Sequence, residues 1–106
     1  MGFFDFLKSP DINQGAEEFG MTPGAVLLDV RTPQEYREGR IPGSVNAPLH
    51  SLTADGAVPA GKDTALFVYC HSGARSRQAV GLLARMGYKN VKNIGGIAAY
   101  RGKVER

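Results

Sequence analysis

Three short segments that are typical of buried strands constrain what this chain can fold into. Residues 25–30 and 65–70 are almost continuously apolar, residues 91–94 form a shorter segment, and a weaker one covers residues 44–47 between two turn signals. A strand that leaves one face to water alternates apolar and polar residues, whereas an unbroken apolar strand is typical of a sheet covered on both faces. The sequence therefore predicts a mostly parallel sheet with helices on either side.

Helical segments alternate with these runs. Thr32, followed three residues later by Glu35, forms a capping signal, and Gly39 marks the end of the short helix that this signal begins. Apolar residues spaced three and four apart predict a longer helix over residues 76–86, and a weaker helical pattern covers residues 11–19. Helices alternating with strands over short connections predict an α/β domain.

The composition fits a single domain over residues 1–106. The chain is 42% hydrophobic and 22% charged, which is ordinary for a globular protein. A net charge of +3 without a run of like charges argues against a nucleic-acid partner. No stretch reaches the roughly 20 apolar residues of a membrane span, and the start has no basic lead, so we expect no membrane partner and a cytoplasmic location.

Cys70 opens the segment that carries the chemistry. It is the only cysteine, so it forms no internal disulfide, and with only His50 and His71 as further soft ligands no metal site is predicted. Cys70 ends one apolar run, and a helical pattern begins at Ser76. Ligands of open parallel sheets bind at the carboxyl ends of the strands, so we expect Cys70 at a binding edge.

The loop after Cys70 favours a negatively charged sulfur. Gly73 permits a tight turn that directs backbone N–H groups inward, the helix start adds the positive end of its dipole, and Arg75 adds a permanent cation. These groups are expected to lower the thiol pKa below its free value of about 8.5 and to make the sulfur a nucleophile. The alternative is an inert, buried cysteine that merely ends a strand.

The spacing of the loop bears on which anion it holds. Four residues separate Cys70 from Arg75, one fewer than in the Cys-x5-Arg loop with which cysteine phosphatases wrap phosphate. A tighter ring suits one additional sulfur atom, as in a persulfide, better than a tetrahedral phosphate. A phosphatase or arsenate reductase on the same fold stays as an alternative, as does a non-catalytic binding or redox-relay module.

The loop belongs to a longer series of motifs that resembles the single-domain rhodanese family. The series comprises Asp29-Val30-Arg31, Glu35-Tyr36, residues 39–46, residues 70–76, and Gly95-Gly96 through Tyr100. It covers about residues 11–102 and leaves residues 1–10 as an N-terminal extension. Arg40 and Tyr100 depart from the histidine and tryptophan that are frequent at these two positions, and both lie outside the loop. The resemblance implies a rhodanese fold, with a mostly parallel five-stranded sheet flanked by helices.

The resemblance also implies sulfurtransferase activity through a cysteine persulfide, with no metal or organic cofactor. Cys70 would take the outer sulfur of a small anionic donor such as thiosulfate and pass it to cyanide, to a thiol or to a protein acceptor. Arg75 would orient the donor, or else pair with a nearby acid; His71 would bind the donor, or else point to solvent. The remaining loop residues, Ser72, Gly73, Ala74 and Ser76, would bind substrate mainly through backbone N–H groups.

Three further expectations concern structural roles. Ser76 is a candidate N-cap of the helix that follows the loop. Asp29, Arg31 and Glu35 are expected to fix a turn, because an arginine at a strand end with a nearby carboxylate usually does so. His50 has no identifiable partner in the sequence and is expected in a loop.

Overall fold

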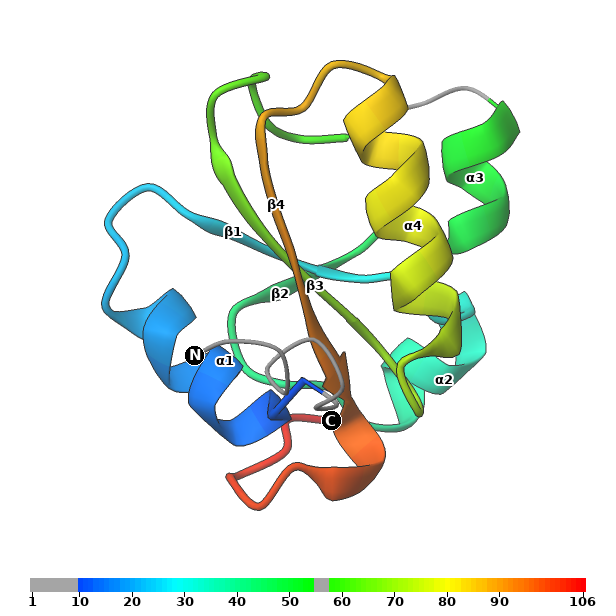
Figure 1. Cartoon of the computed structure of the whole chain (residues 1–106). Coiled ribbons are helices and arrows are strands. Elements are labelled where there is room, and N and C mark those ends of the chain that lie inside the picture. Colours follow the sequence, from blue (N-terminus) through cyan, green and yellow to red (C-terminus); the bar gives the residue numbers. More distant parts are fainter. Residues whose placement is uncertain (1–9, 55–57) are drawn as a thin grey trace, which may run out of the picture.

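A computed structural model of the protein describes residues 10–54 and 58–106, so residues 1–9 of the expected N-terminal extension lie outside the described residues. The described strands are β1 (Val26–Asp29), β2 (Ser44–Asn46), β3 (Ala65–Cys70) and β4 (Asn90–Gly96). They form one sheet in the order β2-β1-β3-β4, and every pairing is parallel (Figure 1). The predicted parallel sheet is confirmed.

The described sheet has four strands, not the expected five. The one isolated bridge in the described part of the chain joins Arg40 and Glu105, whose backbone N–H groups donate to each other's carbonyls at 2.9 and 2.8 Å. The next hydrogen-bonded pair of this antiparallel ladder would need an N–H at residue 42. Pro42 has none, so the pairing stops at a single bridge.

The described helices are α1 (Ile12–Gly20), α2 (Pro33–Glu38), α3 (Leu49–Ala54), α4 (Ala74–Arg85) and the 3₁₀ helix η2 (Ile97–Ala99). The capping box predicted for α2 is present, because the Thr32 hydroxyl accepts from the Glu35 N–H and the Glu35 carboxylate accepts from the Thr32 N–H. The loop assignment of His50 is wrong, because His50 lies in α3, whose six residues are too few to show a helical apolar period. None of the described helices is both long and apolar enough to cross a membrane.

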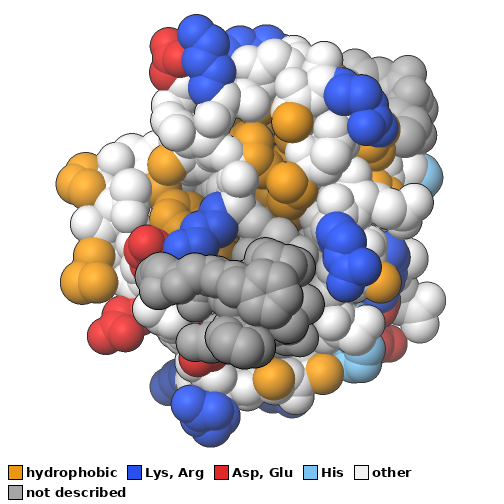
Figure 2. Space-filling model, in the orientation of Figure 1, with side chains coloured by type: hydrophobic (Ala, Val, Ile, Leu, Met, Phe, Trp, Pro, Cys, Tyr) orange, Lys and Arg blue, Asp and Glu red, His pale blue; other side chains and the backbone are white. Residues whose placement is uncertain are grey.

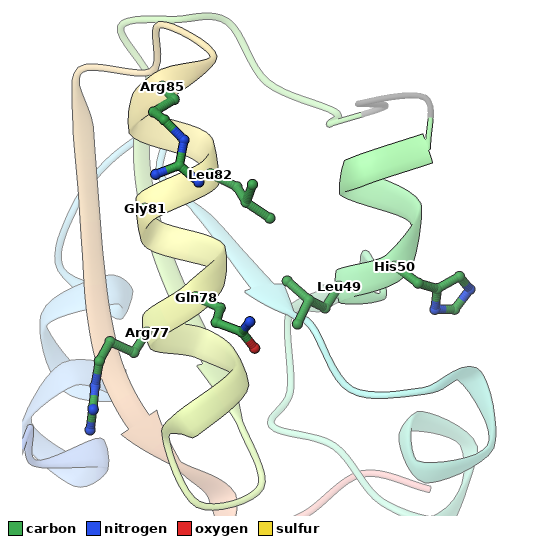
Figure 3. Close-up of a pocket in the computed structure, with 7 residues that line it drawn as sticks. All are labelled: Leu49, His50, Arg77, Gln78, Gly81, Leu82 and Arg85. Atoms are coloured by element: carbon green, nitrogen blue, oxygen red, sulfur yellow. The ribbon is translucent and has the colours of Figure 1, made fainter.

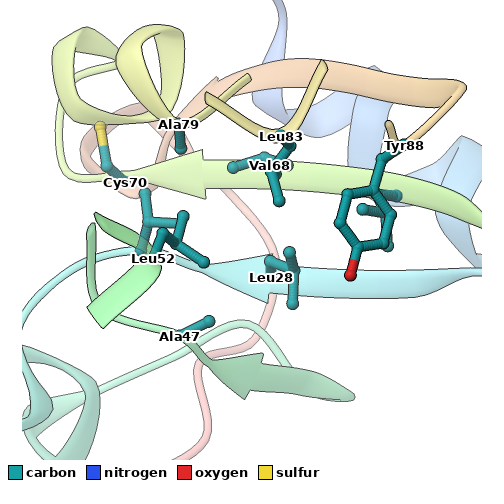
Figure 4. Close-up of a cluster of buried hydrophobic side chains, with 10 residues drawn as sticks. Leu28, Ala47, Leu52, Val68, Cys70, Ala79, Leu83 and Tyr88 are labelled. Atoms are coloured by element: carbon teal, nitrogen blue, oxygen red, sulfur yellow. The ribbon is translucent and has the colours of Figure 1, made fainter. Parts of the chain in front are cut away.

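Helices cover both faces of the sheet, with α3 and α4 on one face and α1 on the other (Figure 1). One buried cluster lies on the α4 side and includes Leu28, Val68 and Cys70 (Figure 4). A second cluster on the α1 side includes Leu27 and Phe67. Neighbouring residues of β1 and β3 therefore enter opposite cores, which explains the almost continuous apolar runs of these two strands.

Candidate active site

Two parallel strands end side by side at the edge where the site was predicted. β1 ends at Asp29, which is in register with Tyr69, the residue before Cys70 in β3. The Arg31 guanidinium binds Asp29, with 2.7 Å between Nη2 and Oδ2, and donates to the carbonyl of Gly39 at 2.6 Å. Asp29 and Arg31 are both buried. This geometry fixes the turn after β1, the role expected for the pair.

Cys70 is the last residue of β3 and is only 1% exposed. Its sulfur points toward the first turn of α4 (Figure 4). Gly73, at a φ of 107°, adopts the left-handed conformation that favours glycine and donates its N–H to Cys70 Sγ at 3.0 Å. α4 begins directly after this glycine. The strand, the turn and the helix start thus meet at the sulfur, as predicted.

Ser76 lies beside the sulfur, in the first turn of α4, and is fully buried. Its Oγ is 3.5 Å from Cys70 Sγ. The same hydroxyl is 3.0 Å from the carbonyl oxygen of Gly73 and 2.8 Å from Oδ1 of Asn93. The prediction that Ser76 caps the helix is wrong, because Gly73 is the N-cap and the helix begins two residues before Ser76. The hydroxyl instead lies within reach of the sulfur.

The pKa of Cys70 reflects a balance between burial and hydrogen bonding. Burial raises this pKa, but the Ser76 hydroxyl and backbone N–H groups of the loop lower it by more. The N–H groups belong to Ser76, Gly73 and Ser72. The net effect is a pKa below the ordinary value of a thiol. The direction agrees with the prediction, and the loop's own donors account for it.

Arg75 is bound to an acid from another element. Its two terminal nitrogens lie 2.7 and 3.1 Å from the two carboxylate oxygens of Glu35, in the first turn of α2. Hydrogen bonds from Arg75 are the main cause that lowers the pKa of Glu35 to about 2, and the carboxylate in turn raises the pKa of Arg75. Of the two roles considered for Arg75, the structure shows the pairing with an acid. Donor binding by Arg75 stays a prediction.

Two surface hollows meet at His71, which is exposed. The first, of about 300 Å³, is lined by the loop and β4 and includes Ser72 and Arg77. The second, of about 380 Å³, lies toward α2 and includes Glu35. Ala74 is exposed and lines neither hollow. His71 can therefore meet a ligand from either side, and its role in donor binding stays a prediction.

The glycine pair at the end of β4 lets this strand approach the loop closely. Gly95 adopts a φ of 107°. A side chain at Gly96 would collide with the backbone carbonyl of His71, which accepts the N–H of Ala98 at 3.0 Å. The end of β4 can therefore pack against the loop only if residue 96 has no side chain. No group of three or more His, Cys, Asp or Glu in the described part of the chain could hold a metal ion.

Two residues beside the site were missed by the sequence analysis. Asn93 accepts from the Ser76 hydroxyl and also from the N–H of Gly95 at 2.9 Å, so it links β4 to the first turn of α4. The signal that could have identified Asn93 is a polar residue inside a segment that is predicted to be a buried strand. Arg77 lines the first hollow. It carried no signal of its own, because exposed arginines are normal on the polar face of a helix.

Comparison with known proteins places this geometry in a family. The sequence profile of the Rhodanese-like domain matches residues 13–103. A sulfurtransferase of Allochromatium vinosum is 41% identical over 81 residues, which cover 74% of each chain. The thiosulfate sulfurtransferase PspE of Escherichia coli is 40% identical over 72 residues, which cover 66% of this chain and 68% of PspE.

Solved structures show the same fold. The rhodanese-like domain of an Anabaena protein superposes with a TM-score of 0.72 at 30% identity, covering 80% of this chain and 84% of that domain. A rhodanese from E. coli, solved with anions, superposes with a TM-score of 0.64 at 31% identity, covering 77% and 98%. The chain therefore belongs to the family of rhodanese-like domains.

Proposed function

We propose that this protein transfers sulfane sulfur through a persulfide on Cys70. In the loading step, the Cys70 thiolate attacks the outer sulfur of thiosulfate. A new S–S bond forms at Cys70, the S–S bond of thiosulfate breaks, and sulfite leaves with the electron pair. One thiolate and one thiosulfate dianion thus become one persulfide anion and one sulfite dianion, so charge and atoms balance.

In the unloading step, an acceptor nucleophile attacks the outer sulfur of the persulfide. With cyanide, a C–S bond forms, thiocyanate leaves, and Cys70 regains its thiolate. A thiolate acceptor would leave as a persulfide in the same way. The Cys70 persulfide is formed in the first half-reaction and consumed in the second, so ping-pong kinetics are expected. Neither step needs a strong general base, because sulfite and the Cys70 thiolate are good leaving groups.

The observation that carries the proposal is the set of donors around the sulfur. Cys70 Sγ accepts the Gly73 N–H at 3.0 Å, and the neutral thiol donates to Ser76 Oγ at 3.5 Å. Once the thiol is ionised, the Ser76 hydroxyl can turn its proton to the sulfur. Such donors stabilise a thiolate both as the attacking group and as the leaving group. The names of the relatives, sulfurtransferase and thiosulfate sulfurtransferase, support sulfur transfer as the activity class.

The donor anion would enter through the hollows that meet at His71. Arg77 in the first hollow has no ion pair with another described residue, so its charge is available to the sulfonate end of thiosulfate. Arg75 would contribute by exchanging Glu35 for the donor. A reducing compartment such as the cytoplasm would keep the sole thiol free between turnovers.

Intact-mass analysis after thiosulfate treatment tests the proposal. The wild type should gain the mass of one sulfur atom, and cyanide should remove it with formation of thiocyanate. Cys70→Ser should gain nothing and should keep the wild-type circular dichroism spectrum, because serine retains the size and the polar contacts of the thiol.

The same preparation separates the alternatives. Absence of a mass gain with thiosulfate, mercaptopyruvate and glutathione persulfide would contradict the proposal. Turnover of an aryl phosphate by a protein that takes up no sulfur would instead indicate a phosphatase. A Cys70 thiol that alkylates like a free thiol, with no sulfur uptake, would favour a binding or redox-relay module.

A further inference from the structure

A groove of about 630 Å³ lies between α3 and α4, outside the two hollows that meet at His71. Leu49 of α3 and Leu82 of α4 point toward each other across it, with Gln78 next to them (Figure 3). Both leucines are half-buried, and Leu82 belongs to neither core cluster. The described residues therefore leave apolar walls open to a ligand.

Basic side chains flank this groove along α4. Arg77 and Arg85 are exposed and lie eight residues apart, which is about 12 Å along a helix. Neither makes an ion pair with another described residue, and none of the described residues that line the groove is acidic. On the face shown in Figure 2, basic side chains are visible over the α4 side, and the acidic side chains lie mainly toward the edges.

Gly81 lies midway between the two arginines on the same face of α4. Its backbone φ is not positive, and an added methyl group would meet only Nη1 of Arg85 at 3.7 Å, an ordinary contact. Glycine in an exposed helix costs about 1 kcal/mol relative to alanine. The fold itself therefore does not require a glycine here. The missing side chain leaves a notch in the face that a partner can enter.

This face is continuous with the active site, because Arg77 lines both the groove and the first hollow beside the loop. We propose that the groove docks an acidic segment, carrying apolar side chains, of a protein that accepts sulfur from Cys70. The inference rests on the proposed sulfur transfer. Two separated arginines match carboxylates, and the leucine walls match apolar side chains. A nucleic-acid backbone has phosphates but no apolar groups for these walls.

The docked acceptor would present a cysteine to the loaded enzyme. Its thiolate attacks the outer sulfur of the Cys70 persulfide, a new S–S bond forms on the acceptor, and the Cys70 thiolate leaves. An acceptor docked in the groove lies more than one helical turn from the loop. Docking would therefore raise the local concentration of the acceptor thiol at Cys70 without adding a catalytic group. Transfer to cyanide would not use the groove.

A dye-labelled peptide provides the binding test. The probe is an amphipathic helix with leucines on one face, glutamates beside them and one terminal cysteine; its partner peptide has lysine in place of each glutamate. In fluorescence anisotropy titrations, the wild type should bind the acidic peptide at least tenfold more tightly than the lysine peptide. The affinity for the acidic peptide should fall as the salt concentration rises. Equal binding of the two peptides would overturn the proposal.

Three variants locate the binding. Arg85→Glu should weaken it at least fivefold, because it reverses one flanking charge. Gly81→Gln should do the same by filling the notch, and glutamine is a better helix former than glycine, so unfolding cannot explain the loss. Arg101→Glu is the matched control: this exposed residue follows η2, near α1 on the opposite face, and the substitution changes net charge equally. An equal loss in the control would overturn the proposal.

Sulfur transfer provides the second readout. Preloaded Gly81→Gln should pass sulfur to the acidic peptide at least fivefold more slowly than the wild type, while its transfer to cyanide is unchanged. Failure of every variant to load sulfur would contradict the proposed function, whereas the anisotropy results would still decide the docking surface. Displacement of the peptide by an equal concentration of a short RNA would assign the face to nucleic acid and overturn the proposal.

Discussion

The turn after β1 and the loop after β3 begin at the same edge of the sheet, but they stabilise charge with different groups. After β1, the buried Arg31 is satisfied by Asp29 and by a backbone carbonyl, so the charges are matched within the fold. After β3, the Cys70 sulfur is surrounded by backbone N–H groups and the Ser76 hydroxyl. These donors favour a negative charge on the reactive sulfur.

The comparison indicates which feature distinguishes a structural edge from a reactive one. Charged side chains are abundant in both regions, so their number does not distinguish the structural region from the reactive one. At the turn after β1, each charge has a partner of opposite sign. At the loop after β3, the one ion pair that the described residues form nearby joins Arg75 to Glu35, and the sulfur is hydrogen-bonded by neutral donors. Neutral donors can stabilise a thiolate and then a persulfide without a competing counter-ion.

The largest effect is expected when the pair after β1 is broken. Arg31→Met leaves the fully buried Asp29 carboxylate without its cation, so it should lower the free energy of unfolding by about 3–5 kcal/mol in urea titrations near neutral pH. Lys89→Met is the control, because its ion pair with Asp63 is 73% and 86% exposed and should contribute less than about 1 kcal/mol. Equal losses would contradict a structural role for the buried pair.

A smaller effect is expected at the sulfur. Ser76→Ala removes the hydroxyl that lies 3.5 Å from Cys70 Sγ and should raise the pKa of that thiol. A rise of one pKa unit, worth about 1.4 kcal/mol, would slow alkylation about tenfold at a pH below the pKa. Ser72→Ala should change the rate less than about twofold, because Ser72 acts through its backbone N–H. Equal rates for the two variants would contradict the role of the Ser76 hydroxyl.

The smallest effect is expected for the pair between the two regions. The pKa of Glu35 is about 2 in the folded protein and 4.5 ordinarily, so its carboxylate stabilises the fold fully above about pH 4.5 and progressively less as the pH falls toward 2. Over that range, urea titrations should show the wild type losing more stability than Glu35→Gln, by less than about 1 kcal/mol because the pair is partly exposed. The difference should shrink in an Arg75→Gln background, where the carboxylate keeps only its hydrogen bonds from Thr32. An undiminished difference there would contradict the pairing.

Local patterns were sufficient to predict the elements that depend on neighbouring residues. The cap at Thr32 and the order of strands and helices follow from spacing within a few positions. The strand ending at Cys70 and the turn at Gly73 follow in the same way. The rest depends on packing. α4 begins at Ala74, and so makes Ser76 a buried hydroxyl instead of a cap, because the left-handed Gly73 can end the loop directly.

Contacts between distant segments could not be predicted from one sequence. Glu35 lies 40 residues before Arg75, and Asn93 lies 17 residues after Ser76. No local pattern selects these partners, because several other charged and polar residues stand at comparable separations. The four-stranded sheet was missed for a related reason. Whether a fifth strand extends from the bridge at Arg40 depends on the proline two residues later and on where the segment around Glu105 packs.

The pH dependence of alkylation of Cys70 tests most directly whether the loop after β3 stabilises a negatively charged sulfur. Cys70 is the only cysteine, so the rate of reaction with iodoacetamide reports on this thiol alone. Hydrogen bonds from the loop predict a midpoint below the free value of about 8.5, shifted upward in Ser76→Ala. A wild-type midpoint at or above the free value, unchanged by Ser76→Ala, would contradict the account.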